Sequence, residues 1–191
     1  MGHLELQTDA TVEPVTLAEL KTQLRVSGSS EDDLLTGLIT AARQIVEAYT
    51  HRALITQTWD YIISNPGSVI RIPMPPLQSV TSITSYDLDN DSTDEGTAKW
   101  YAVTNTTPGE IRLNNGETWA SVIRDNGFVI EFKCGYGAAA SAVPGSLVTA
   151  VKMIASALYE NRGDSADSNT DRIIKYSGAA PVMQRYIYMV S

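Results

Sequence analysis

The residues of this chain that come nearest to a metal site are three aspartates in one short run. Asp87, Asp89 and Asp91 alternate along Asp-Leu-Asp-Asn-Asp, which is how a calcium-binding loop begins. Such a loop then needs a glycine and a bidentate glutamate, where this chain has Ser92 and Ala98. The run is therefore predicted to be a solvated acidic turn, and the sequence predicts no metal site.

Residues that could carry covalent chemistry are few and scattered. Neither His3 nor His51 stands at a motif spacing from a serine or cysteine that it could activate. The single cysteine, Cys134, lies in a strand-like run, which favours a buried small hydrophobic residue. The glycines of Gly135-Tyr-Gly137 are not followed by the Gly-Lys-Ser/Thr of a phosphate loop. The sequence thus predicts no catalytic residue and no cofactor site.

Composition narrows the class of protein further. The 191 residues are 43% hydrophobic and carry a net charge of -8, which fits one folded domain with an insertion. An acidic chain repels phosphate, so sequence-reading DNA binding is disfavoured. No apolar run approaches the roughly 20 residues of a membrane helix, and no secretion signal is apparent, so we expect a reducing cytosol and no membrane partner.

Two amphipathic helices are predicted in the first quarter of the chain. The first, near 17–25, begins at a capping box in which Thr16 is the N-cap and Glu19 follows three residues later. The second, near 31–51, has an apolar stripe of period 3.6, and Arg43 and Glu47 are assigned to its polar face. The residues of that stripe are Leu34, Leu35, Leu38, Ile39, Ala42, Ile45, Val46 and Tyr49.

The middle of the chain changes to β-branched residues with turn signals between them. A third helix is predicted near 145–162, opened by Pro144 and ended by Gly163. We therefore predict an α+β fold: a small helical bundle with a β-rich insertion and an extended or short-helical tail. Its predicted parts are a helical part at 1–52 with a loose arm over 1–13, the insertion at 53–137, the third bundle helix at 138–163, and a linker and tail at 164–191.

Two apolar groups suggest partner binding. The aromatic residues Trp59, Trp100, Trp119 and Tyr101 could form a ligand platform, for example for carbohydrate, although aromatics in β regions are more often core. The end of the chain is apolar and follows a polar linker, so it either folds back or is buried in a partner. The tail residues predicted to contact a partner are Val182, Met183, Tyr186, Ile187, Tyr188 and Met189.

Several motifs, taken in order, resemble one protein family. They are Thr16-Leu-Ala-Glu-Leu-Lys, Asp32-Asp-Leu-Leu, the run from Ala41-Ala-Arg to Arg52, Ile72-Pro-Met-Pro-Pro-Leu, Gly135-Tyr-Gly, Val143-Pro-x-x-Leu and Tyr159-Glu-Asn-Arg162. Together they are similar to the head–tail connector (adaptor, or head-completion) proteins of tailed double-stranded-DNA bacteriophages. The tail keeps only Gln184-Arg-Tyr186 of the arginine-rich ending expected in that family.

The resemblance implies a structural protein and not an enzyme. Such proteins form a ring, in relatives usually of about twelve copies, and head-to-tail closure requires two different complementary faces on each subunit. The implied partners are other copies of the chain, the portal at the capsid vertex and a tail-side stopper or tail-completion protein. DNA would pass through without sequence-specific binding. The implied location is the head–tail interface of a virion made in a bacterial cytoplasm. The tail would dock on the portal, and Arg43 and Glu47 are weaker candidates for ring contacts. The alternative left open is a phage carbohydrate-binding or decoration module.

Overall fold

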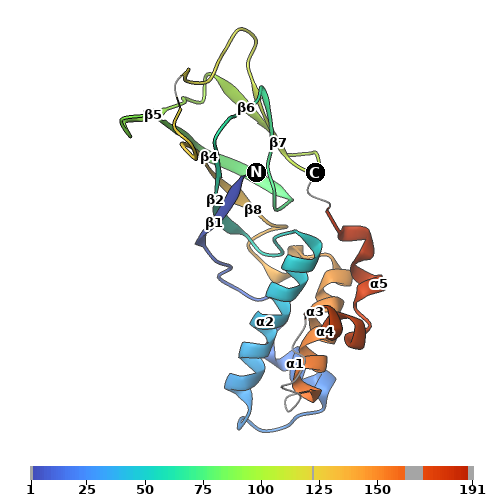
Figure 1. Cartoon of the computed structure of the whole chain (residues 1–191). Coiled ribbons are helices and arrows are strands. Elements are labelled where there is room, and N and C mark those ends of the chain that lie inside the picture. The colour runs from blue at the N-terminus through green and yellow to red at the C-terminus, as the bar shows by residue number, and fades with distance from the viewer. Residues whose placement is uncertain (1, 122, 162–169, 189–191) are drawn as a thin grey trace. The chain divides into compact units, whose positions relative to one another are not determined.

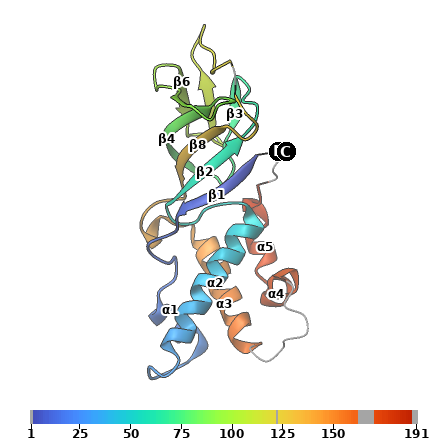
Figure 2. The same ribbon diagram turned by 60° about the vertical axis from the view of Figure 1, so that its left-hand side comes forward.

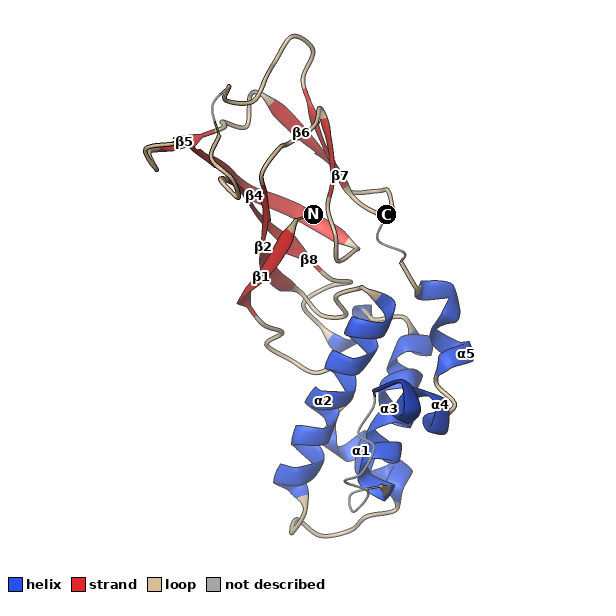
Figure 3. Ribbon diagram, in the orientation of Figure 1, coloured by secondary structure: helices blue, strands red, loops and turns tan. Residues whose placement is uncertain are grey.

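The computed structural model describes residues 2–121, 123–161 and 170–188, which form five α-helices and eight strands. They divide into two compact units, each treated by itself below. The helical unit contains residues 11–55 and 137–188, and the β unit contains residues 2–10 and 56–136. Helices and strands separate cleanly between the two units, which Figure 3 shows by colour. The predicted α+β class is confirmed.

Three helices form the centre of the helical unit: α1 (Leu17–Leu24), α2 (Asp32–Thr50) and α3 (Gly145–Glu160). The capping box predicted at the start of α1 is confirmed, because Thr16 accepts from the Glu19 N–H and the Glu19 carboxylate accepts from the Thr16 N–H. Helix α3 packs along α2, and both pack on α1 (Figures 1 and 2). The fully buried stripe includes Leu20, Leu35, Ile39, Val46, Leu147, Val151 and Ile154.

Short helices follow in the rest of this unit. They are η1 (Ala140–Ala142), α4 (Thr170–Ser177), α5 (Ala180–Met183) and η2 (Gln184–Tyr186). Helices α4 and α5 both pack against α3. The predicted C-terminal stop of α3 at Gly163 lies outside the described residues, and the helix ends at Glu160.

The β unit contains one five-stranded antiparallel sheet in the order β1-β2-β8-β4-β5. Its strands are β1 (His3–Thr8), β2 (Gln57–Ile63), β8 (Phe128–Cys134), β4 (Leu77–Tyr86) and β5 (Ser92–Asp94). The prediction of a loose arm is wrong for residues 3–8, which pair with β2 as an edge strand. Six residues cannot form a sheet alone, so the local sequence gave little sign of a partner that lies some 50 residues away.

A second, three-stranded sheet has the order β3-β7-β6. Its strands are β3 (Val69–Arg71), β7 (Glu110–Leu113) and β6 (Trp100–Val103), all within the region predicted to be β-rich. Each sheet buries one face, because strand side chains alternate between faces. The buried residues are Ile70, Trp100 and Ile111 on this sheet, and Ile83, Phe128, Ile130 and Phe132 on the larger one.

Helix length and hydropathy decide whether a helix could span a membrane. Within residues 2–121, 123–161 and 170–188, none of the helices has the length and apolar content needed to cross a membrane.

Candidate functional site

The C-terminal segment, residues 170–188, returns onto its own helical unit. Gly178, with φ of +71°, provides the left-handed turn between α4 and α5, where a side chain would be strained. Ile174, Ala179 and Met183 are buried, at 3%, 0% and 0% exposure. These three residues make the inner side of the segment part of the core of the helical unit.

Polar contacts hold the end of the segment in place. The Tyr188 N–H donates to the Thr50 carbonyl at 3.0 Å, and Arg52 Nε donates to the Tyr186 carbonyl at 2.5 Å. Arg185 Nη2 donates to Ser146 Oγ at 2.6 Å and to the Tyr186 hydroxyl at 2.8 Å. The segment is thus tied both to the end of α2 and to the start of α3.

The tail residues predicted to bind a partner differ in how deeply they are buried. Val182, Tyr186, Ile187 and Tyr188 are half-buried, whereas Met183 is fully buried and Met189 lies outside the described residues. A shallow cavity of about 460 Å³ borders the first of them and is lined by Ser146, Pro181, Val182, Gln184 and Arg185. Of the predicted contact residues, Val182 alone lines this cavity, and the half-buried Tyr186, Ile187 and Tyr188 follow it along the segment.

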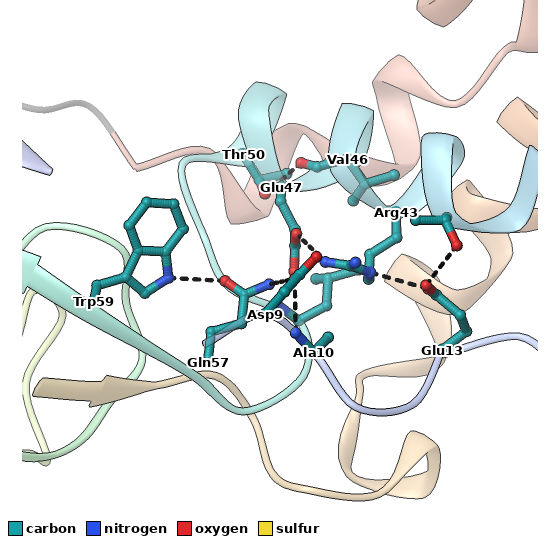
Figure 4. Close-up of polar contacts among 11 residues, drawn as sticks. Asp9, Ala10, Glu13, Arg43, Val46, Glu47, Thr50, Gln57 and Trp59 are labelled. Atoms are coloured by element: carbon teal, nitrogen blue, oxygen red, sulfur yellow. Dashed lines mark hydrogen bonds and ion pairs between the residues drawn. The ribbon is translucent and has the colours of Figure 1, made fainter. Parts of the chain in front are cut away.

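Arg43 and Glu47 form a buried ionic cluster with Glu13. Arg43 Nε lies 2.9 Å from Glu13 Oε2, and Arg43 Nη1 lies 2.8 Å from Glu47 Oε2 (Figure 4). Arg43 is 1% exposed and Glu47 is 6% exposed. The assignment of both residues to an exposed polar face of the helix is therefore wrong. Their role in ring contacts stays a prediction, and this structure offers little exposed surface at either one.

Buried charges need partners at each polar atom, and this cluster provides several. Glu13 Oε1 accepts the Thr40 hydroxyl at 2.8 Å, and Glu47 Oε1 accepts the Leu54 N–H at 2.8 Å. Glu13 precedes α1, and Leu54 follows α2. The cluster therefore fixes the segments by which the chain enters and leaves this part of the helical unit, and sequence periodicity alone could not show that role.

A second buried carboxylate, Glu95, plays a comparable part within the β unit. It is 0% exposed and accepts from the Ser85 hydroxyl at 2.7 Å, the Lys99 ammonium at 2.8 Å and the Ala120 N–H at 3.0 Å. Burial raises the pKa of Glu95, but these three donors outweigh it and leave the pKa below its usual value. With its oxygens occupied in this way, Glu95 links strand β4 to the segments that contain Lys99 and Ala120.

The residues considered for chemistry belong to different elements of the fold. Asp87 Oδ1 accepts the N–H groups of Asp89 and Asp91, both at 2.9 Å, so its carboxylate closes the acidic turn. His51 ends α2 in a left-handed conformation, with φ of 52°. Cys134 is fully buried, as predicted. Across the described parts of the chain, no three His, Cys, Asp or Glu side chains come together as a metal-binding group.

The three tryptophans do not form an exposed platform. Trp100 is 7% exposed, and Trp59 and Trp119 are half-buried. The Trp119 ring meets Phe128 edge-on at 5.0 Å, and its indole N–H donates to the Gly67 carbonyl at 2.9 Å. The Trp59 indole N–H donates to Gln57 Oε1 at 2.9 Å. Hydrogen bonds within the unit thus account for the indoles of Trp59 and Trp119, and burial accounts for Trp100.

Comparison with known proteins identifies relatives by sequence and by structure. Residues 14–108 match the family described as phage gp6-like head-tail connector protein. No curated protein sequence matches the chain.

Three solved structures that this chain resembles come from gene transfer agent particles. A chain from the neck of an empty gene transfer agent particle, computed with C6 symmetry, is 25% identical with a TM-score of 0.81, and the match covers 99% of this chain and 97% of that one. A chain from the virion of a native gene transfer agent particle is 26% identical with a TM-score of 0.76, covering 98% and 96%. A third, from the native neck computed with C12 symmetry, is 24% identical with a TM-score of 0.73 and shares the fold, covering 98% and 97%.

Proposed function

Because this chain belongs to the phage head–tail connector proteins and is a structural subunit of the neck, we propose that its copies form a closed ring there. The ring has about twelve copies and lies between the portal at the capsid vertex and a tail-side stopper or tail-completion protein. DNA passes through it without sequence-specific binding. The net charge of -8 supports this, because an acidic wall gains little from releasing the counterions of DNA.

One observation carries the proposal. The likeness to a chain of a six-fold symmetric neck extends over 99% of this chain and 97% of that chain, so it includes both units and the C-terminal segment. Six-fold symmetry is compatible with six or twelve copies. A rotationally symmetric ring of identical subunits requires each copy to present two different faces that fit each other.

The C-terminal segment makes the contact with the portal in this proposal. Val182, Tyr186, Ile187 and Tyr188 supply half-exposed apolar and aromatic surface, the kind of surface found at the centres of interfaces. Met183 anchors the segment in the helical core, and Met189 continues it beyond the described residues.

The ring is tested by mass. The purified chain is measured by native mass spectrometry alone and after mixing with its portal protein. The expected species in at least one condition has about twelve times the 20.7 kDa mass of one chain. A chain that is monomeric in both conditions would contradict the ring.

The docking surface is tested by replacing one tyrosine. Tyr188→Ala is expected to weaken portal binding roughly tenfold or more, because half-buried aromatics are frequent hot spots. Tyr176→Ala is the matched control, since Tyr176 is 69% exposed on α4 outside the predicted contact. Equal portal affinity for the two variants would remove Tyr188 from the interface.

The alternative, a carbohydrate-binding module, is not supported. It required an exposed aromatic shelf, whereas the tryptophans are buried or half-buried in the β unit.

A further inference from the structure

Three carboxylates stand side by side on the outer face of the five-stranded sheet. Glu5 of β1 lies directly opposite Asp60 of β2, and Asp60 lies directly opposite Glu131 of β8. The side chains before and after Glu131, Ile130 and Phe132, point to the buried face, so these acids point outward. We call the three residues the acidic face.

This arrangement costs the monomer stability. Like charges directly opposite each other in a sheet are destabilising. Burial, and then the charges of Glu131 and Glu5, raise the pKa of Asp60, while a hydrogen bond from Gln7 at 2.8 Å opposes the rise. Of the two neighbouring rows of the same face, one has the half-buried apolar pair Ile62 and Val129, and the other has Thr58 opposite the exposed Lys133. The acidic face thus combines mutually repelling carboxylates with apolar surface.

The three-stranded sheet presents the opposite character on its own outer face. Val69, Arg112 and Tyr101 face one another across the three strands, and Arg71 lies two residues along from Val69. Val69 and Tyr101 are 43% and 47% exposed, and the side chains of Arg71 and Arg112 are 65% and 47% exposed. We call these four residues the basic face. Glu110 lies 3.7 Å from Arg71 and 2.6 Å from Arg112, so one carboxylate serves two guanidinium groups and the face remains positive.

We propose that the ring closes through the β unit, the acidic face of each copy packing against the basic face of the next copy. The inference rests on the proposed ring and names the surfaces that make it. The two faces lie on different sheets of one unit, which is what a head-to-tail contact requires. They differ in charge, and each adds apolar surface beside its charged groups. An arginine brought to the acidic face would relieve the repulsion within it.

A second copy is the occupant that these features favour. The chain has a net charge of -8, so a neighbouring copy approaching at random would be repelled. Pairing unlike faces gives the approach one favourable orientation. The sequence alone did not suggest these surfaces, because each consists of single residues from three strands that only the sheet register aligns.

Charge reversal tests the pairing. Glu5→Lys/Glu131→Lys removes two like charges beside Asp60, so the monomer is expected to fold at least as well as wild type. Its rings are expected to require roughly tenfold or more higher protein concentration, because the positive face now meets arginines. Arg71→Glu is expected to do the same from the other side, and it leaves the pair of Arg112 and Glu110 intact.

Rescue separates a direct contact from a general change in charge. A chain carrying all three reversals has complementary faces again and is expected to recover most of the wild-type ring at the original concentration. Asp89→Lys, in the exposed turn between β4 and β5, is the matched control and should not alter assembly. Ring formation is read by native mass spectrometry in the condition in which wild type assembles, and thermal unfolding confirms that each variant is folded.

Each outcome decides a separate question. Rings unaffected by either reversal would overturn the face pairing and leave the proposed ring in place. Reversed chains that still close rings but lose a tail-side protein would assign the faces to that protein and also overturn the pairing. A wild-type chain that never forms rings would overturn the proposed function and this inference with it.

Discussion

The two units of this protein differ in how they place their arginine clusters. In the helical unit, Arg43 is nearly inaccessible and is held between Glu13 and Glu47. In the β unit, Arg71 and Arg112 are largely exposed around one shared carboxylate, and acids stand beside acids on the other sheet. Among the described residues, Glu95 is the buried charged side chain of the β unit.

Buried and exposed charges have different roles, the first in the stability of the fold and the second in association with other proteins. A buried ion pair with each oxygen bonded fixes the chain path, and loss of one member leaves an uncompensated charge. Exposed charges contribute little to folding but direct how surfaces meet. The Arg43 cluster of the helical unit thus shows charges used inside the fold, and the exposed arginines and acids of the β unit, Glu95 apart, are charges left available for a neighbour.

Arg43→Met should give the largest effect on stability. It leaves Glu13 and Glu47 without their guanidinium, so the free energy of unfolding is expected to fall by about 3–5 kcal/mol in urea denaturation. Arg112→Ala, at the exposed counterpart, is expected to change the free energy of unfolding far less, because exposed ion pairs contribute little to stability. Similar losses of unfolding free energy in the two variants would show that the buried and the exposed arginine do not differ in their contribution to stability.

Met183→Ala tests the inner side of the C-terminal segment. Met183 is fully buried, so removing its side chain is expected to cost about 2–5 kcal/mol. Val182→Ala, at the half-buried neighbour, should cost distinctly less in the same denaturation experiment. If the two substitutions are equivalent, the segment is not packed as the structure has it.

Glu19→Gln tests a surface charge that does stabilise the helical unit. A hydrogen bond from Lys152, followed by those from Thr16, lowers the pKa of Glu19 from 4.5 to about 2. A carboxylate with a lowered folded pKa stabilises above its unfolded value, and the contribution is lost as pH falls from 4.5 toward 2. The variant is expected to be less stable than wild type by about 1 kcal/mol at pH 7. Thermal unfolding across this pH window should show the difference shrink; a constant difference would refute the assignment.

Asp60→Asn should give the smallest effect, with the opposite sign. Because the folded pKa of Asp60 is raised, its negative charge lowers the stability of the folded protein. This loss of stability grows as pH rises from the unfolded pKa to the folded pKa. The variant is expected to be more stable at pH 7 by less than about 1 kcal/mol, since like charges no longer stand opposite each other. At a pH below the usual aspartate value of 3.8, the two proteins should unfold alike. A destabilised variant at pH 7 would show that the acidic face is not repulsive.

Local sequence patterns were sufficient for much of the fold. The capping box at Thr16 and the apolar stripe of α2 located helices within a residue or two. Strands β3, β6 and β7 lie in the middle region, which β-branched residues and turn signals predicted to be β-rich. These signals succeed because capping, helical period and strand alternation are determined by residues close in the sequence.

The sequence by itself determined the α+β class, the fully buried Cys134 and an apolar chain end, and its ordered motifs pointed to the connector family. Only the tertiary structure decided that residues 3–8 pair with β2, that Arg43 turns inward to two glutamates, and that Met183 belongs to the helical core. It also aligned acids from three strands on one face. The physical reason is the same for all four features, because each depends on contacts with residues distant in the sequence. The burial and charge that set the free energy of such a contact are not encoded in any local pattern.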